Sequence, residues 1–183
     1  MLAIKIKSTV VTSTVTGVRP CWKGQTGRVV NASLVCAHSV LDAKTLEPAM
    51  VGQDVVYANL AGQLEQQARR IVKAMQNTGV KRLIFISSMG IYDEVPGEHY
   101  GSILDPYRKS ARLIEASGLD YTILRPAWLN DRDEIDYATT HKGEPFKNAH
   151  EQVSRKSVAD LVVKLAMTPG MEVRSSLGVH RVS

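Results

Sequence analysis

The stretch DVVYANLAGQLEQQARRIVKAMQNTGVKRLIFI, residues 54–86, decides the fold. It opens with Asp54–Asn59, a short run rich in apolar, β-branched and aromatic residues, which predicts a strand buried on both faces. From Gln63 to Asn77, apolar residues recur at spacings of four, three and four, which predicts an amphipathic helix. Leu83–Ile86 is a second apolar run. A strand, a helix and a strand in this order predict a right-handed crossover between parallel strands, with the helix on one face of the sheet.

The same alternation of elements extends to both sides of this unit. Upstream, Asp42–Met50 is expected to form a short helix. Downstream, Asp105-Pro106 has the form of an N-cap followed by proline at the first helical position, so a helix should begin there. A strand is expected at Tyr121–Leu124 and should be broken by Arg125-Pro126, because proline cannot donate to a sheet ladder. The last expected elements are a helix from Ser157, capped by the S-x-x-D pair Ser157 and Asp160, and an edge strand at Leu177–Val182.

Length and composition place the chain among single-domain proteins. Its 183 residues can bury one sizeable core, and a hydrophobic fraction of 44% is ordinary for a soluble domain. No apolar run reaches the roughly 18 residues of a membrane span, and no secretory signal is recognisable, so we expect a cytoplasmic protein that does not enter a membrane. Cys21 and Cys36 form no metal-binding pattern and are expected to be reduced bystanders. His141 and His150 also lack partners at metal-ligand spacing, so no metal site is predicted.

The net charge of +5 is located at the N-terminus. Residues 1–41 hold five Lys and Arg and no acid; removing those five from the 23 basic residues leaves 18, equal to the 18 acidic residues of the chain. The basic segment contains no nucleic-acid-binding motif, so a nucleic-acid partner is not expected. We predict one α/β domain over residues 1–183, in which 1–40 is an atypical segment and 41–183 alternates strands and helices around a parallel sheet.

Three motifs carry a resemblance to a known family. KRLIFISSMGIYDEVPGE (81–98), SGLDYTILRPAWL (117–129) and VSRKSVADLV (153–162) occur in an order and spacing that resemble the NmrA-like, atypical short-chain dehydrogenase/reductases. DVVYANLAG (54–62) is similar to the fourth strand of that family and the turn after it. The resemblance implies a Rossmann-like parallel sheet with flanking helices that binds NADP or NAD at the carboxyl ends of its strands.

The resemblance also implies which residues line the cofactor cleft. Ala58, Asn59 and Leu60 correspond to the segment beside the adenosine and ribose. Ser87 and Ser88 offer hydroxyls to a ribose or a substrate carbonyl. Pro126, Ala127 and Trp128 correspond to the nicotinamide end. Each residue also has a simpler interpretation: the serines can be satisfied by nearby backbone, Asn59 can serve a turn, and Trp128 can belong to the core.

Catalytic residues are harder to assign, because hydride chemistry in the larger superfamily uses a Tyr-x-x-x-Lys pair. Lys109 is preceded at the fourth position by Asp105 rather than by tyrosine. Tyr107 is two residues from Lys109, about 200° away around a helix, so the two side chains cannot share a face. Ser88, Tyr107 and Lys109 remain the catalytic candidates, and Lys109 is also a cofactor-binding candidate. The acidic loop containing Glu94 is interpreted either as the border of a substrate cleft or, preferably, as solvated charge.

The N-terminal segment departs from the family. A Gly-rich turn should admit the pyrophosphate of a dinucleotide to a helix N-terminus, but the chain offers only Gly24 and Gly27. Residues 1–41 are also too few for two βαβ units of about 30 residues each. Our hypothesis is that residues 1–40 derive from a truncated gene, an alternative start or a shifted frame. An incomplete sheet would leave a strand edge that a second copy of the chain could cover.

Two functions therefore remain open at the level of sequence. The first is an NAD(P)-dependent oxidoreductase acting on an unidentified small molecule. The second is a non-catalytic protein, either a sensor that binds NAD(P) or a remnant that binds no cofactor.

Overall fold

A seven-stranded sheet forms the centre of the protein. The computed structural model describes residues 7–12, 31–34, 40 and 43–182, and the strands run in the order β2-β1-β3-β4-β5-β9-β7. Every neighbouring pair is parallel except β7 and β9, which are antiparallel. The strands are β1 (Lys7–Thr12), β2 (Asn31–Leu34), β3 (Val55–Asn59), β4 (Arg82–Ile86), β5 (Asp120–Pro126), β7 (Ala138–His141) and β9 (Ser175–His180).

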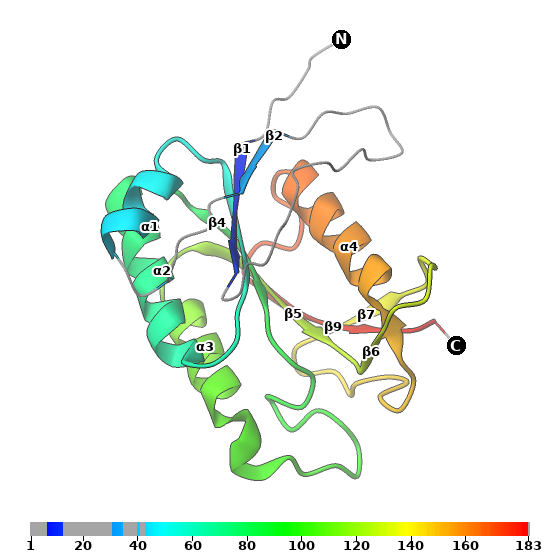
Figure 1. Cartoon of the computed structure of the whole chain (residues 1–183). Coiled ribbons are helices and arrows are strands. Elements are labelled where there is room, and N and C mark those ends of the chain that lie inside the picture. The colour runs from blue at the N-terminus through cyan, green and yellow to red at the C-terminus, as the bar shows by residue number, and fades with distance from the viewer. Residues whose placement is uncertain (1–6, 13–30, 35–39, 41–42, 183) are drawn as a thin grey trace.

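Helices cover both faces of this sheet. Figure 1 shows α1, α2 and α3 side by side on one face and α4 on the other. A small parallel pair, β6 with β8, lies beside the start of α4. The bounds are α1 Ala43–Met50, α2 Leu64–Thr78, α3 Asp105–Glu115, α4 Arg155–Met167, β6 Leu129–Asn130, β8 Val153–Ser154 and one 3₁₀ turn, η1, at Gly101–Leu104.

The β3-α2-β4 crossover is confirmed. β3 and β4 are parallel neighbours in the interior of the sheet, and α2 connects them. Gly79 ends α2 with a left-handed φ of 77°, which glycine adopts without the strain that a Cβ would bring. The strand residues alternate between two apolar layers: Leu83 and Phe85 pack under the three-helix face, whereas Ile84 packs under α4. Burial on both faces explains why these strands are continuous apolar runs.

Four predicted element ends are corrected by the structure. Asp105 has helical backbone angles and Leu104 is the N-cap, because the preceding η1 turn leads directly into α3. The last helix begins at Arg155, and its cap is Ser154, whose side chain accepts a hydrogen bond from the Ser157 amide. The strand β5 continues through Arg125 to Pro126. The predicted edge strand instead spans Ser175–His180 and lies inside the sheet, between β5 and β7.

The described part of the N-terminal segment contributes to the same sheet. β1 pairs with β3 in register from Ser8↔Val55 to Thr12↔Asn59, and β2 pairs with β1 on its other side. Among the described residues, two strands therefore precede β3 in the chain. The pair Gly24 and Gly27, like both cysteines, lies outside the described residues.

Candidate functional site

The carboxyl ends of the parallel strands bring most of the predicted cofactor residues to one edge of the sheet. Asn59 ends β3 and its side chain is exposed. Ser87 and Ser88 follow β4, and Ala127 and Trp128 follow β5. Because β3, β4 and β5 are consecutive parallel neighbours, these ends lie side by side. Ligands of open parallel sheets bind along this edge.

Several residues at this edge can act through their backbone alone. The side chains of Ala58 and Leu60 are 0% and 7% exposed and belong to the core under α1–α3. Pro126 is buried within β5, and the adjacent Ala127 donates its amide hydrogen to Val179 O at 2.9 Å. Trp128, in contrast, is 62% exposed, so the interpretation of this residue as core is wrong.

Ser87 has the most informative environment of the predicted site residues. Its backbone amide donates to Leu124 O at 2.7 Å, which extends the pairing of β4 with β5 by one step. The side chain is 6% exposed, and its Oγ has no hydrogen-bond partner in the part of the chain that the structure describes. A buried hydroxyl without a partner is costly. The prediction that nearby backbone satisfies this side chain is therefore wrong, and the Ser88 side chain beside it is half-buried.

Tyr107 and Lys109 do not form a catalytic pair. Tyr107 is half-buried and packs against the core under α1–α3, whereas Lys109 is 60% exposed and approaches Glu65 of α2 at 3.9 Å. The two side chains thus point to different surroundings, as their spacing predicted. Lys109 is engaged with the surface of α2 rather than with Ser87 or Ser88.

Sequence reasoning missed a buried polar network beside this edge. Glu94 is 5% exposed, so its interpretation as solvated loop charge is wrong, and it accepts a hydrogen bond from the fully buried guanidinium of Arg125. The ring of Tyr92 lies 5.2 Å from Arg125 Cζ, and its hydroxyl donates to Glu115 Oε1 at 2.7 Å. Burial first, and then that carboxylate, raise the pKa of Tyr92. A single carboxylate in an irregular loop has no periodicity that would predict this.

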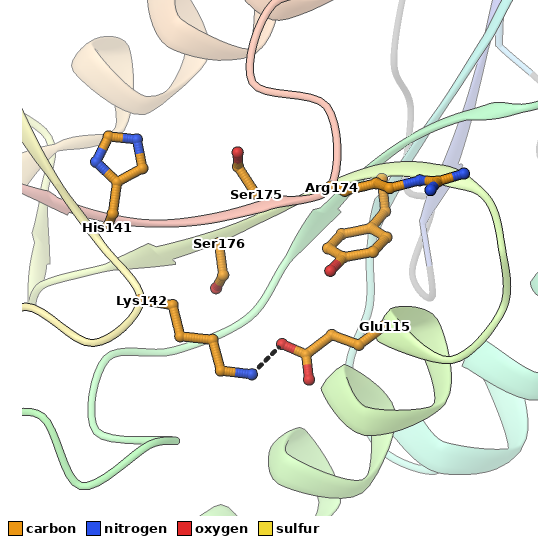
Figure 2. A pocket seen from close by; sticks show the side chains of 7 residues that line it. Glu115, His141, Lys142, Arg174, Ser175 and Ser176 are labelled. Carbon is orange, nitrogen blue, oxygen red and sulfur yellow. Dashed lines mark hydrogen bonds and ion pairs between the residues drawn. The ribbon is translucent and has the colours of Figure 1, made fainter.

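Two hollows adjoin the network. The first, of about 380 Å³, is shown in Figure 2, where Lys142 reaches toward Glu115; their Nζ–Oε1 distance is 2.7 Å. It lies at the amino ends of β5 and β9, the opposite edge from Ser87. The second, of about 490 Å³, is bounded by the loops after β4 and β7 and shares Lys142 with the first. The first is lined by Glu115, Tyr121, His141, Lys142, Arg174, Ser175 and Ser176.

Neither a cluster of metal-ligating side chains nor a membrane-spanning helix occurs among the described residues. No group of three or more His, Cys, Asp and Glu side chains is arranged there to hold a metal ion. His141 is 52% exposed and contacts Glu172 at 3.2 Å, and His150 is exposed, as expected of surface residues. None of the helices in this part of the chain is both long and apolar enough to cross a bilayer.

A largely parallel sheet with helices on both faces, and with small and hydroxyl-bearing residues at its carboxyl edge, is an arrangement in which α/β proteins bind dinucleotides. Comparison with known sequences agrees. The chain belongs to the NAD(P)H-binding family, whose sequence model matches residues 23–169. The match begins at residue 23 and so includes part of the segment 1–40, which we interpreted as foreign to the family.

Solved structures of similar proteins share this fold. A Rossmann-fold NAD(P)-binding family protein from Shigella flexneri is 44% identical, with a TM-score of 0.73, covering 84% of this chain and 72% of its own. A short-chain dehydrogenase/reductase from Veillonella parvula DSM 2008, solved in complex with NADP, is 26% identical with a TM-score of 0.73, covering 84% of this chain and 74% of its own.

A curated relative adds a different activity class. An uncharacterised sugar epimerase from Bacillus subtilis (strain 168) is 30% identical over 100 residues, which are 52% of this chain and 44% of the relative. The chain thus spans less than half the length of that relative. Proteins similar to this chain thus include a sugar epimerase as well as short-chain dehydrogenase/reductases.

Proposed function

We propose that the protein binds NADP(H) across the carboxyl edge of β3, β4 and β5 and acts as an oxidoreductase on a small molecule. The observation that carries this proposal is Ser87 Oγ, a buried hydroxyl at that edge without a partner in the described part of the chain. A ribose hydroxyl or a substrate carbonyl would satisfy it. The choice of NADP over NAD rests on the NADP complex of the Veillonella relative.

The other residues of the edge fit the same ligand. The exposed amide of Asn59 and the backbone of Ala58 and Leu60 would lie along the adenosine side, and the small Ala127 would leave room beside the nicotinamide. The bound dinucleotide would supply or accept a hydride. The residues of the chain would bind and orient it and, through Trp128, shield one side from water.

Fluorescence can test the placement of the cofactor, because the chain has two tryptophans, Trp22 and Trp128. Reduced nicotinamide absorbs the light that tryptophan emits. In Trp22→Phe, Trp128 is the one remaining tryptophan, and we expect NADPH to quench its emission with strong energy transfer. Saturable binding of NADPH to this variant without energy transfer would place the nicotinamide away from β5. Absence of binding heat with NADP, NADPH and NAD would refute the proposal.

A second candidate function is binding without turnover, as in a redox sensor. The separation of Tyr107 and Lys109 favours it, because the usual proton donor and its lysine are not paired. Saturable NADPH binding without NADPH oxidation across a panel of aldehydes, ketones and quinones would support the sensor. Oxidation of NADPH that depends on one of these compounds would support the enzyme.

A further inference from the structure

The ion pair of Arg125 and Glu94 is the most deeply buried charge pair in the described part of the chain. Arg125 is 0% exposed and Glu94 5%. Beyond Glu94, the guanidinium donates to Ser176 Oγ at 3.1 Å and to the backbone oxygens of Thr140 and Ser176 at 3.4 and 3.3 Å. Arg125 therefore ties β5 to β9 and β7 beneath the loop that carries Glu94.

Glu94 in turn fixes the course of its own loop. Its two carboxylate oxygens accept hydrogen bonds from the amides of Gly90, at 3.0 Å, and Tyr92, at 2.9 Å. Gly90 has a φ of 81°, and a Cβ there would lie 2.4 Å from the ring of Tyr100, so the turn is closely packed. On the outer side, Arg108 donates to Ile91 O at 3.2 Å. The loop is held from both sides.

The two ends of this ion pair belong to the two segments of the proposed cofactor edge. Glu94 holds the loop that begins with Ser87 and Ser88, and Arg125 immediately precedes Pro126 and Ala127. The segments also pair through backbone, since the Met89 amide donates to Pro126 O at 3.3 Å. A shift of Glu94 relative to Arg125 would therefore move the serine hydroxyls relative to the end of β5.

Stability alone does not account for such a pair. Burying two charges costs solvation energy that their attraction often fails to offset, and well-packed apolar replacements are commonly as stable. Breaking the pair by removing one partner is nevertheless strongly destabilising, because the other charge stays buried. A buried ion pair that adds little stability can instead serve to hold the segments around it in one arrangement.

We propose that Arg125 and Glu94 are positioning residues, which hold the Ser87-Ser88 loop and the end of β5 in the arrangement that binds the dinucleotide. The inference rests on the proposed function for its ligand. Its structural part, the fixed loop, can be measured without any ligand.

The test compares Glu94→Gln, Arg125→Met and the double variant in the full chain. We expect each single variant to lower the unfolding midpoint and the double variant to recover much of that loss. In the double variant, hydrogen exchange at the Gly90 and Tyr92 amides should stay faster than in wild type, and the Kd for NADP should be at least about tenfold higher, because the loop is no longer fixed. Recovery of stability together with wild-type exchange and wild-type Kd would overturn the proposal and leave the pair a purely structural contact.

An exposed ion pair between the loop after β6 and the first residue of α4 provides the matched control. Arg155 and Asp131 lie 2.7 Å apart, with side chains 57% and 86% exposed. The double variant Asp131→Asn with Arg155→Met should change neither the exchange at Gly90 nor the affinity for NADP. An equal loss in this control would show a general effect of charge and overturn the proposal.

Two further outcomes remain decisive. If wild type does not bind NADP, the proposed function fails, while the exchange comparison still supports or overturns the positioning of the loop. If the double variant does not fold, Arg125→Lys takes its place, since lysine keeps the charge but loses the planar set of donors. Faster exchange at Gly90 and Tyr92 in that variant supports the proposal, and unchanged exchange contradicts it.

Discussion

Replacing Ser87 by alanine should stabilise the ligand-free protein. The Ser87 side chain is 6% exposed and its Oγ has no partner in the described part of the chain. A buried unsatisfied polar group costs about 1–3 kcal/mol. Alanine removes that group and keeps the Cβ, at the expense of the contacts of one oxygen atom. We expect a net gain of about 1 kcal/mol, which in a chain of this size raises Tm by about 2–4 °C.

The same substitution should weaken cofactor binding. A hydrogen bond from Ser87 to the bound dinucleotide would contribute about 0.5–1.5 kcal/mol, so we expect Kd for NADP to rise about 2- to 10-fold. Urea titration at equilibrium measures the first effect, and calorimetry measures the second. Stability and affinity should move in opposite directions.

Ser154 is the matched control for this experiment. It is fully buried, but its hydroxyl accepts from the Ser157 amide at 2.9 Å and donates to Glu134 O at 2.6 Å. Ser154→Ala should therefore lose about 1–2 kcal/mol, the usual cost of a helix cap, without a change in NADP affinity. A loss of stability in Ser87→Ala as large as that in Ser154→Ala would refute the reasoning, because it would show that the Ser87 hydroxyl is satisfied in the free protein.

Three other outcomes follow from the structure. A Cβ at Gly178 would lie 2.5 Å from Thr140 Oγ1 and 2.7 Å from the Phe146 ring, so Gly178→Ala should cost about 1–3 kcal/mol in urea, relieved in part by Phe146→Leu. Burial raises the pKa of Tyr57 from 10.0 to about 12, so its neutral form stabilises the fold below pH 10 and that contribution is lost as pH rises toward 12. The unfolding free energy should fall there by less than about 2.7 kcal/mol, and by a smaller amount in Tyr57→Phe. Lys142→Met should change the unfolding free energy by less than about 1 kcal/mol, because the Lys142 side chain is 48% exposed and its pairing with Glu115 is screened by solvent.

The parts of the fold that sequence predicts well are those with a strong period. Two strands are buried on both faces, and the apolar runs Asp54–Asn59 and Leu83–Ile86 therefore predict them directly. The α2 helix shows its period because one side packs on the sheet while the other meets solvent. The β7 strand, Ala138–His141, was missed because it is short and mixed in polarity, and its pairing with β9 is a contact distant in sequence.

The candidate site likewise contains residues that local sequence patterns predict and residues that they do not. Its strand-end residues were predictable, because the carboxyl ends of parallel strands meet at one edge. Whether Ser87 Oγ is satisfied depends on a packed environment that no local pattern encodes. The burial of Glu94 depends on Arg125, 31 residues further along the chain. The predicted cap of α4 was wrong for a simpler reason. Ser154 and Ser157 both offer a hydroxyl near the start of α4, and the hydrogen bond from the Ser157 amide shows that Ser154 is the cap.

The place of β9 in the sheet has a consequence for synthesis. β9 follows every other described strand in the chain, yet it lies between β5 and β7. During translation, the edge of β5 that pairs with β9 therefore stays unpaired until Ser175–His180 leaves the ribosome. Until then β7 also lacks the strand with which it pairs. Exposed strand edges of this kind invite pairing with other chains. The nascent protein should thus be prone to aggregate until β9 emerges, and a chaperone would benefit it in that interval.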